Sequence, residues 1–149
     1  MRNFQIKIPK SSSIQLYDEN EKLVGEILTN LILGLKEKIK IEDKIFRIKS
    51  NGFIGIDIKV FDEKETLIIE SHTSKNRLIY FGDIKEIYTY KNEKWFDNKV
   101  NLFKEEKLAM SIKVLGTFKS AYEIEVAKDF SNSLVILTFL NFYNRLSGA

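Results

Sequence analysis

The sequence predicts a mainly β fold: a closed antiparallel barrel of about twelve strands around a central hydrophobic C-terminal α-helix. Two patterns lead to this prediction. From residue 3 to 127 the chain holds short runs with an apolar residue at every second position, which is typical of half-buried strands. From Ser131 to Leu146 the chain is almost wholly apolar and contains no glycine or proline, which predicts a helix.

The predicted strands follow one another with short breaks. Glu42-Asp43 and Asn51-Gly52 are examples, and such breaks indicate hairpin turns between antiparallel strands. The segment 25–36 fits a strand and also a short helix, so both stay open there. The strand-like runs are NFQIKI, SIQLYD, KLVGEIL, KEKIKI, KIFRIKS, FIGIDIKVF, TLIIESH, RLIYFG, IKEIYTYK, KWFDNKVNLF, LAMSIKVLG and FKSAYEIEVA.

The C-terminal helix is apolar on nearly every side. Thr138, Asn141 and Arg145 form one narrow polar stripe, so the rest of the surface must be surrounded by protein or lipid. Its sixteen residues rise about 24 Å, whereas a bilayer span takes about 20 apolar residues. A barrel of eleven or more strands has room for a helix, and we therefore expect the helix to be the core of the barrel. Asp129 or Ser131 is expected to cap its start and Gly148 to follow its end.

Composition indicates one globular domain over residues 1–149, with strands at about 3–127 and the core helix at about 130–146. The chain has no cysteine, which excludes disulfides and thiolate metal sites, and no cofactor is predicted. Its net charge of +3 is too small to indicate a nucleic-acid binder. The start alternates apolar with polar residues, so a cytoplasmic location is expected, with peripheral attachment to a membrane as an extension.

The last strands and the helix carry a family resemblance. The run AMSIKVLGTFKSAYEIEV, the acidic start AKDF and the helix SLVILTFLNFY resemble the tubby C-terminal-like superfamily, especially its small bacterial LURP-one-related and scramblase-like members. The resemblance implies a closed twelve-stranded barrel around a central helix and a role in binding at membranes. The headgroup-binding residues of tubby domains have no matching positions here, and the cysteine-rich and calcium-binding segments of scramblases are missing.

The sharpest local feature is the basic hairpin in LKEKIKIEDKIFRIKS. If Glu42-Asp43 is a two-residue turn, the hairpin places five cations on one face. Like charges placed directly across strands are destabilising, so this face needs counter-charge from neighbours, solvent or an anionic partner. A lysine-rich solvated face is the other interpretation. The predicted pairs are Lys40 with Ile45, Lys38 with Arg47, and Lys36 with Lys49.

Other polar residues give weaker signals. In the loop 71–77, Lys75 and Arg77 could contact an anion, and the loop also fits an ordinary polar turn. His72 is the only histidine, which excludes a histidine metal cluster, and Asp57 is expected on the outer face as a solvated pair with Lys59. No catalytic motif occurs, so a non-enzymatic protein is predicted.

Two functions follow as hypotheses. The first is a binding module that docks on anionic lipid headgroups or phosphorylated ligands through the basic residues Lys36, Lys38, Lys40, Arg47 and Lys49, with Lys75 and Arg77. The second is a protein-interaction or scaffold domain whose lysines are only solubilising. It predicts an exposed patch around Tyr88, Tyr90 and Trp95.

Overall fold

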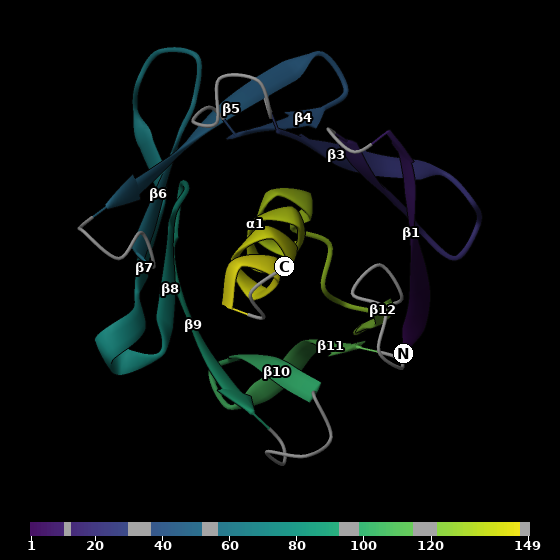
Figure 1. Cartoon of the computed structure of the whole chain (residues 1–149). Coiled ribbons are helices and arrows are strands. Elements are labelled where there is room, and N and C mark those ends of the chain that lie inside the picture. Colours follow the sequence, from purple (N-terminus) through teal and green to yellow (C-terminus); the bar gives the residue numbers. More distant parts are fainter. Residues whose placement is uncertain (11–12, 30–36, 52–56, 93–98, 115–121, 147–149) are drawn as a thin grey trace.

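A computed structural model describes residues 1–10, 13–29, 37–51, 57–92, 99–114 and 122–146, which form strands, a short 3₁₀ helix and an α-helix (Figure 1). The 3₁₀ helix η1 (Thr73–Lys75) lies between β7 and β8, and α1 (Ser133–Leu146) follows β12. The strands are β1 (Arg2–Lys10), β2 (Ser13–Tyr17), β3 (Leu23–Leu28), β4 (Glu37–Ile41), β5 (Lys44–Asn51), β6 (Asp57–Phe61), β7 (Leu67–His72), β8 (Arg77–Phe81), β9 (Lys85–Asn92), β10 (Lys99–Lys104), β11 (Lys107–Val114) and β12 (Tyr122–Val126).

The strands close into one barrel. Each strand pairs antiparallel with its neighbours in sequence, and β1 pairs with β12, where Arg2 lies opposite Val126 and Phe4 opposite Ile124. Closure leaves none of the twelve described strands with an edge free to pair with another chain. The predicted fold, a closed antiparallel barrel of about twelve strands with one C-terminal helix, is confirmed.

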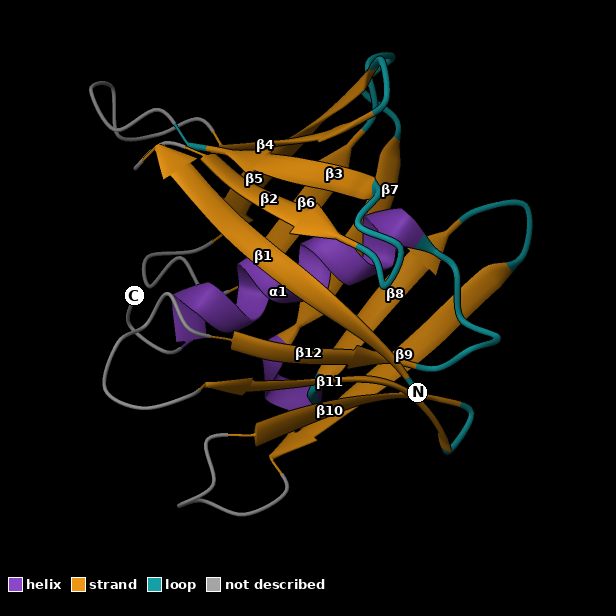
Figure 2. Cartoon of the chain, turned by 90° about the vertical axis from the view of Figure 1, so that its right-hand side faces the viewer, coloured by secondary structure: helices purple, strands orange, loops and turns teal. Residues whose placement is uncertain are grey.

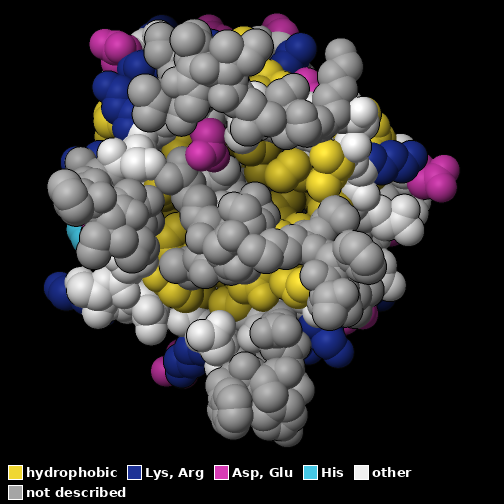
Figure 3. Space-filling model, in the orientation of Figure 1, with side chains coloured by type: hydrophobic (Ala, Val, Ile, Leu, Met, Phe, Trp, Pro, Cys, Tyr) yellow, Lys and Arg dark blue, Asp and Glu magenta, His cyan; other side chains and the backbone are white. Residues whose placement is uncertain are grey.

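Alternation along each strand separates the core from the outer face. On β4 and β5, Ile39 lies opposite Phe46, and Ile39 and Ile48 are buried while the residues that follow them, Lys40 and Lys49, are exposed. Successive side chains of a strand point to opposite faces, so the apolar set of every strand faces the axis. Viewed down the barrel, the described charged side chains lie mainly around the outside and the hydrophobic ones nearer the axis (Figure 3).

The helix α1 lies inside this barrel (Figures 1 and 2). Every residue from Leu134 to Tyr143 is at most 8% exposed, so the helix is covered on all sides. Among its contacts, the ring of Tyr90 lies 6.1 Å from that of Phe139 and 5.2 Å from that of Phe142. The expectation that strands surround an apolar helix is therefore correct. In the part of the chain that is described, no helix is long and apolar enough to cross a membrane.

Gly25 allows the helix to approach β3 closely. A Cβ atom at Gly25 would lie 2.5 Å from Leu137 Cδ1 and 2.8 Å from the Lys40 carbonyl oxygen. Neither distance is possible without movement, and the carbonyl belongs to the backbone of β4. The absence of a side chain at this position thus sets where the helix sits against the β3–β4 wall.

The start of the helix differs from the prediction. Asn132 caps α1, because its Oδ1 accepts a hydrogen bond from the Val135 N–H at 3.1 Å. Asp129 points outward and forms an ion pair with Lys107, and Ser131 is exposed. The chain needs residues 127–132 to turn from β12 into the barrel, which leaves Asn132 as the residue next to the first helical turn. Gly148 lies outside the described residues.

The ambiguous segment 25–36 is resolved only at its beginning. Residues 25–28 belong to β3, and Ile27 lies opposite Ile39 of β4, so this part is a strand. Residues 30–36 lie outside the described residues.

Candidate functional site

The basic hairpin has the register that the sequence predicts. Lys38 lies directly opposite Arg47, and Lys40 opposite Ile45. Since Ile39 and Ile48 face the core, Lys38, Arg47 and their neighbours of the same parity stand on the outer wall. Lys36, and with it the predicted pair with Lys49, lies outside the described residues.

The cationic surface continues from β5 onto β6. Lys49 lies directly opposite Lys59, and Arg47 lies opposite Phe61. Two cations lie over the Phe61 ring, with the Arg47 guanidinium carbon 6.0 Å and Lys49 Nζ 5.3 Å from its centroid. The face of an aromatic ring attracts cations, so Phe61 stabilises both positive charges beside it. We call the outward residues Lys38, Lys40, Arg47, Lys49, Lys59 and Phe61 the basic wall.

Carboxylates neutralise part of the basic wall. Arg47 Nη2 lies 2.7 Å from Glu65 Oε1, and Lys59 Nζ lies 3.9 Å from Glu70 Oε2. Both pairs are substantially exposed, so each contributes about 1 kcal/mol or less to stability. Within the described residues, Lys38, Lys40 and Lys49 form no ion pair. These three lysines leave the wall with charge available to a partner.

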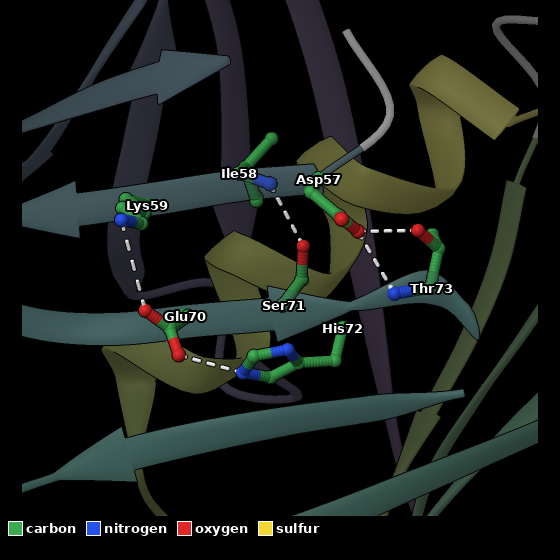
Figure 4. Close-up of polar contacts among 7 residues, drawn as sticks. All are labelled: Asp57, Ile58, Lys59, Glu70, Ser71, His72 and Thr73. Atoms are coloured by element: carbon green, nitrogen blue, oxygen red, sulfur yellow. Dashed lines mark hydrogen bonds and ion pairs between the residues drawn. The ribbon is translucent and has the colours of Figure 1, made fainter. Parts of the chain in front are cut away.

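Glu70 connects the basic wall to the only histidine. Its second oxygen, Oε1, lies 2.6 Å from His72 Nε2 (Figure 4). Glu70 thus has one cationic and one imidazole neighbour on the outer face. In the described part of the chain, no three His, Asp or Glu side chains are grouped so that they could hold a metal ion.

Asp57 lies on the outer face as expected, but its partner is not Lys59. Its Oδ1 accepts hydrogen bonds from the Thr73 N–H at 2.8 Å and from the Thr73 hydroxyl (Figure 4). The hydroxyl bond is the main reason that the pKa of Asp57 lies below its ordinary value, against the opposite effect of partial burial. The Thr73 N–H and nearby His72 act in the same direction as the hydroxyl. Lys59 instead pairs with Glu70.

This contact fixes the β7–β8 hairpin, which carries the last two predicted site residues. Lys75 ends η1, and Arg77 lies opposite His72 and Thr89. Three strand spacings of about 4.8 Å and about four residues along the strands put Arg77 about 20 Å from Arg47. The predicted site residues therefore form two groups on one side of the barrel and not a single cluster.

The predicted aromatic patch is wrong for the residues that are described. Tyr88 and Tyr90 face the core, with exposures of 0% and 6%. Burial raises the pKa of Tyr90 to about 12, and also raises that of Tyr88, whose hydroxyl donates to Glu86 Oε1 at 2.9 Å. Successive side chains of β9 point to opposite faces of the sheet. Tyr88 and Tyr90 therefore point into the barrel, and Ile87 points outward and is 44% exposed. Trp95 lies outside the described residues.

Two polar clusters inside the barrel had no sequence signal. Glu37 faces inward and accepts a hydrogen bond from Asn141 of the helix stripe. Near the start of the helix, Glu86 accepts bonds from Lys104 and Tyr88; although burial raises its pKa, these bonds leave it below the ordinary value. Lys104 also lines a depression of about 300 Å³ with Lys107, whose charge Asp129 balances. This depression offers a ligand little net charge.

Comparisons with known proteins agree on the fold and on nothing finer. No family model matches the chain, and no curated protein matches its sequence. An X-ray structure of a protein from Arabidopsis thaliana is similar, with a TM-score of 0.54 and 11% sequence identity over 94% of this chain and 91% of that one. At this level of identity the likeness shows the shared barrel architecture alone.

Proposed function

We propose that the protein is a non-enzymatic docking module that binds anionic lipid headgroups through the basic wall. The observation that carries the proposal is that Lys38 and Lys49, which form no ion pair within the described residues, lie directly opposite the cations Arg47 and Lys59 on one face. Directly opposed cations weaken a sheet, and a phosphate-bearing surface offsets that repulsion. Each such lysine or arginine near an anionic bilayer contributes about 1 kcal/mol of binding free energy.

We also propose that the chain is a small member of the tubby C-terminal-like superfamily. The support is the resemblance of its last strands and helix, together with a barrel closed around that helix. Membership fits a cytoplasmic protein that attaches peripherally to a membrane.

Flotation with lipid vesicles tests the docking proposal. Vesicles of neutral lipid are compared with vesicles that contain about 30 mol% phosphatidylserine. The variant with Lys38→Glu and Lys49→Glu removes two favourable charges, which corresponds to at least about 2 kcal/mol, or a partition about 30-fold weaker. Soluble inositol phosphate as a competitor distinguishes a headgroup site from an extended surface.

A matched control carries the same charge change elsewhere. Lys22→Glu with Lys128→Glu alters two exposed lysines in turns remote from the basic wall. This control is expected to keep most of the binding. Equal recovery on neutral and anionic vesicles, or equal losses for the two double variants, would refute the proposal.

The alternative, a protein-interaction domain, is favoured by a different observation. Ile84 is 79% exposed in the turn between β8 and β9, and Ile87 stands nearby on the outer face opposite Ile79. Exposed aliphatic side chains in one hairpin are a feature of protein contacts. If Ile84→Ser with Ile87→Thr abolished an association that Lys38→Glu with Lys49→Glu left intact, this alternative would replace the docking proposal.

A further inference from the structure

The barrel has one end at which the described turns are strongly acidic. In an up-and-down barrel every second connection lies at the same end, and Figure 2 shows these turns together at the end opposite the C-terminus. They join β2–β3, β4–β5, β6–β7, β8–β9, β10–β11 and β12–α1, at residues 18–22, 42–43, 62–66, 82–84, 105–106 and 127–132. We call these six connections the acidic end.

Charge is concentrated at this end to an unusual degree. The six connections hold 12 of the 21 Asp and Glu residues of the chain, and only 3 of its 24 Lys and Arg residues, namely Lys22, Lys64 and Lys128. The remaining sequence therefore has 21 cations and 9 carboxylates, although the net charge of the whole is only +3. The strand residues within two residues of this end add two carboxylates, Glu86 and Glu125, and seven cations, namely Arg2, Lys40, Lys44, Lys59, Lys85, Lys104 and Lys107. With them, this end of the barrel has 14 carboxylates and 10 cations, so the protein is polarised along the barrel axis although it is nearly neutral overall.

The turns accommodate these carboxylates in positions that other residues favour. Glu21, Glu42, Glu65, Glu105 and Glu106 have φ between 50° and 66°, a left-handed conformation that glycine and asparagine adopt more easily. Turn geometry alone would therefore favour glycine or asparagine at these five positions. The acidic side chains are thus not simply what these turns require.

The other end of the strands is cationic. Eight cations with described side chains lie within two residues of this end or in the β7–β8 hairpin, namely Lys38, Lys49, Lys59, Lys75, Arg77, Lys91, Lys99 and Lys113. Five carboxylates lie there, and four of them form a hydrogen bond within the protein: Glu26 with Ser13, Glu37 with Asn141, Asp57 with Thr73, and Glu70 with His72. The fifth, Glu123, lies opposite Lys113.

We infer that the protein docks on an anionic bilayer with the acidic end pointing away from it. The contact surface then extends from Lys38 and Lys49 of the basic wall to Lys75 and Arg77 of the β7–β8 hairpin. This inference rests on the docking function proposed above, and it makes the partner an extended membrane surface, because three strand spacings of about 4.8 Å separate β5 from β8 and a single headgroup cannot span them.

Screening makes the orientation decisive. The eight residues of β9 span about 26 Å, or about 20 Å of height once the strand tilts by about 40°. At physiological ionic strength the Debye length is about 8 Å. In the inferred orientation the acidic turns lie beyond two Debye lengths from the lipid and scarcely repel it, and Arg47, which pairs with Glu65 of these turns, lies outside the contact surface. In the reverse orientation all twelve carboxylates would lie next to it.

Because the chain contains no cysteine, single cysteines can report this orientation. Ser74→Cys places an environment-sensitive fluorophore on η1, and Asn20→Cys places one at the acidic end; both positions are exposed. Each labelled protein is first floated with phosphatidylserine vesicles and then measured on vesicles whose headgroups carry a quencher. We expect the Ser74 probe to lose about half of its emission and the Asn20 probe less than about a tenth, because headgroup quenchers act only at close range and the Asn20 probe lies about 20 Å from the lipid.

The outcomes separate the two proposals. If neither labelled protein floats, the docking function is overturned and this inference with it. If both float but the Asn20 probe is quenched as much as the Ser74 probe, or neither is quenched, the orientation alone is wrong.

As an independent measurement, Lys75→Glu with Arg77→Glu should lower vesicle partition at least about tenfold. Glu105→Gln with Glu106→Gln should leave it within about twofold, and the reverse ranking would overturn the inference.

Discussion

Substitution of Gly25 by alanine tests how the helix is seated in the barrel. The new Cβ would lie 2.5 Å from Leu137 Cδ1 and 2.8 Å from the Lys40 carbonyl oxygen. Overpacking of a well-packed core costs about 1–3 kcal/mol, and the backbone carbonyl places this site at the upper part of that range. The lower entropy of the unfolded alanine chain returns about 0.5–1 kcal/mol. The net expectation is a loss of about 2 kcal/mol in the free energy of unfolding.

A double-mutant cycle with Leu137→Ala separates the two contacts. The single substitution Leu137→Ala costs about 3–5 kcal/mol, because Leu137 is 0% exposed and its removal leaves a cavity. In that background Gly25→Ala still meets the Lys40 carbonyl oxygen and Ile41 Cγ1 but no longer Leu137, so it should cost about 1 kcal/mol less than in the wild-type chain. This difference is the coupling energy between the helix and β3.

Urea denaturation of the four proteins, followed by circular dichroism, measures the cycle. Gly25→Ser offers a larger side chain at the same point and should be at least as destabilising as alanine. A neutral or stabilising Gly25→Ala, or costs that add without coupling, would mean that Leu137 does not pack against Gly25 and that the helix is seated differently.

Three further predictions concern single residues. Thr138 is 0% exposed and its hydroxyl has no hydrogen-bond partner among the described residues, so the isosteric Thr138→Val should raise the free energy of unfolding by about 1 kcal/mol, and a loss in urea denaturation would show that the hydroxyl has a partner in solution. Glu21 has φ of 62°, and Glu21→Gly should raise the midpoint of thermal unfolding by about 2 °C, whereas no change or a decrease would mean that the turn is not strained. Ionised Asp57 has a lowered pKa, so it stabilises the fold above the unfolded-state pKa of about 3.9, and this contribution is lost as pH falls through the lower folded-state pKa. Asp57→Asn should therefore be about 1 kcal/mol less stable than wild type at pH 7, with a gap that closes towards about pH 2; a gap independent of pH in urea titrations would contradict the role of the charge.

Much of the fold could be predicted because its signals are local. Alternation identifies each strand, and the two-residue break at Glu42-Asp43 fixes the register that places Lys38 opposite Arg47. The apolar character of α1 required burial, and its length disfavoured a bilayer. These inferences need only the periodicity and length of single segments.

The composition of the candidate site could not be predicted in the same way. The pairing of Lys49 with Lys59 and the position of Phe61 beside Arg47 depend on the register between β5 and β6, and the connection between them is too long to fix that register from sequence. The distance from Arg47 to Arg77 likewise depends on strand order and closure. The cap at Asn132 was missed because it is decided by how the chain enters the barrel, which propensities do not describe.

The charge asymmetry of the barrel was visible only after its topology was known. The acidic tips at 17–23, 61–67 and 103–108 are conspicuous in the sequence as similar turns. That they gather at one end follows from the up-and-down order of the strands. The same topology gives the cations of the strands and of the β7–β8 hairpin a common direction.

Salt dependence of wild-type binding tests the central claim most directly. The partition of the intact chain onto vesicles with about 30 mol% phosphatidylserine is measured from about 50 to about 300 mM NaCl. Docking through the basic wall predicts strong binding at low salt that falls at least about tenfold across this range, with a shallower slope for Lys38→Glu with Lys49→Glu. Binding that is independent of salt, or absent at about 50 mM, would contradict the claim that this barrel presents its cations to an anionic membrane.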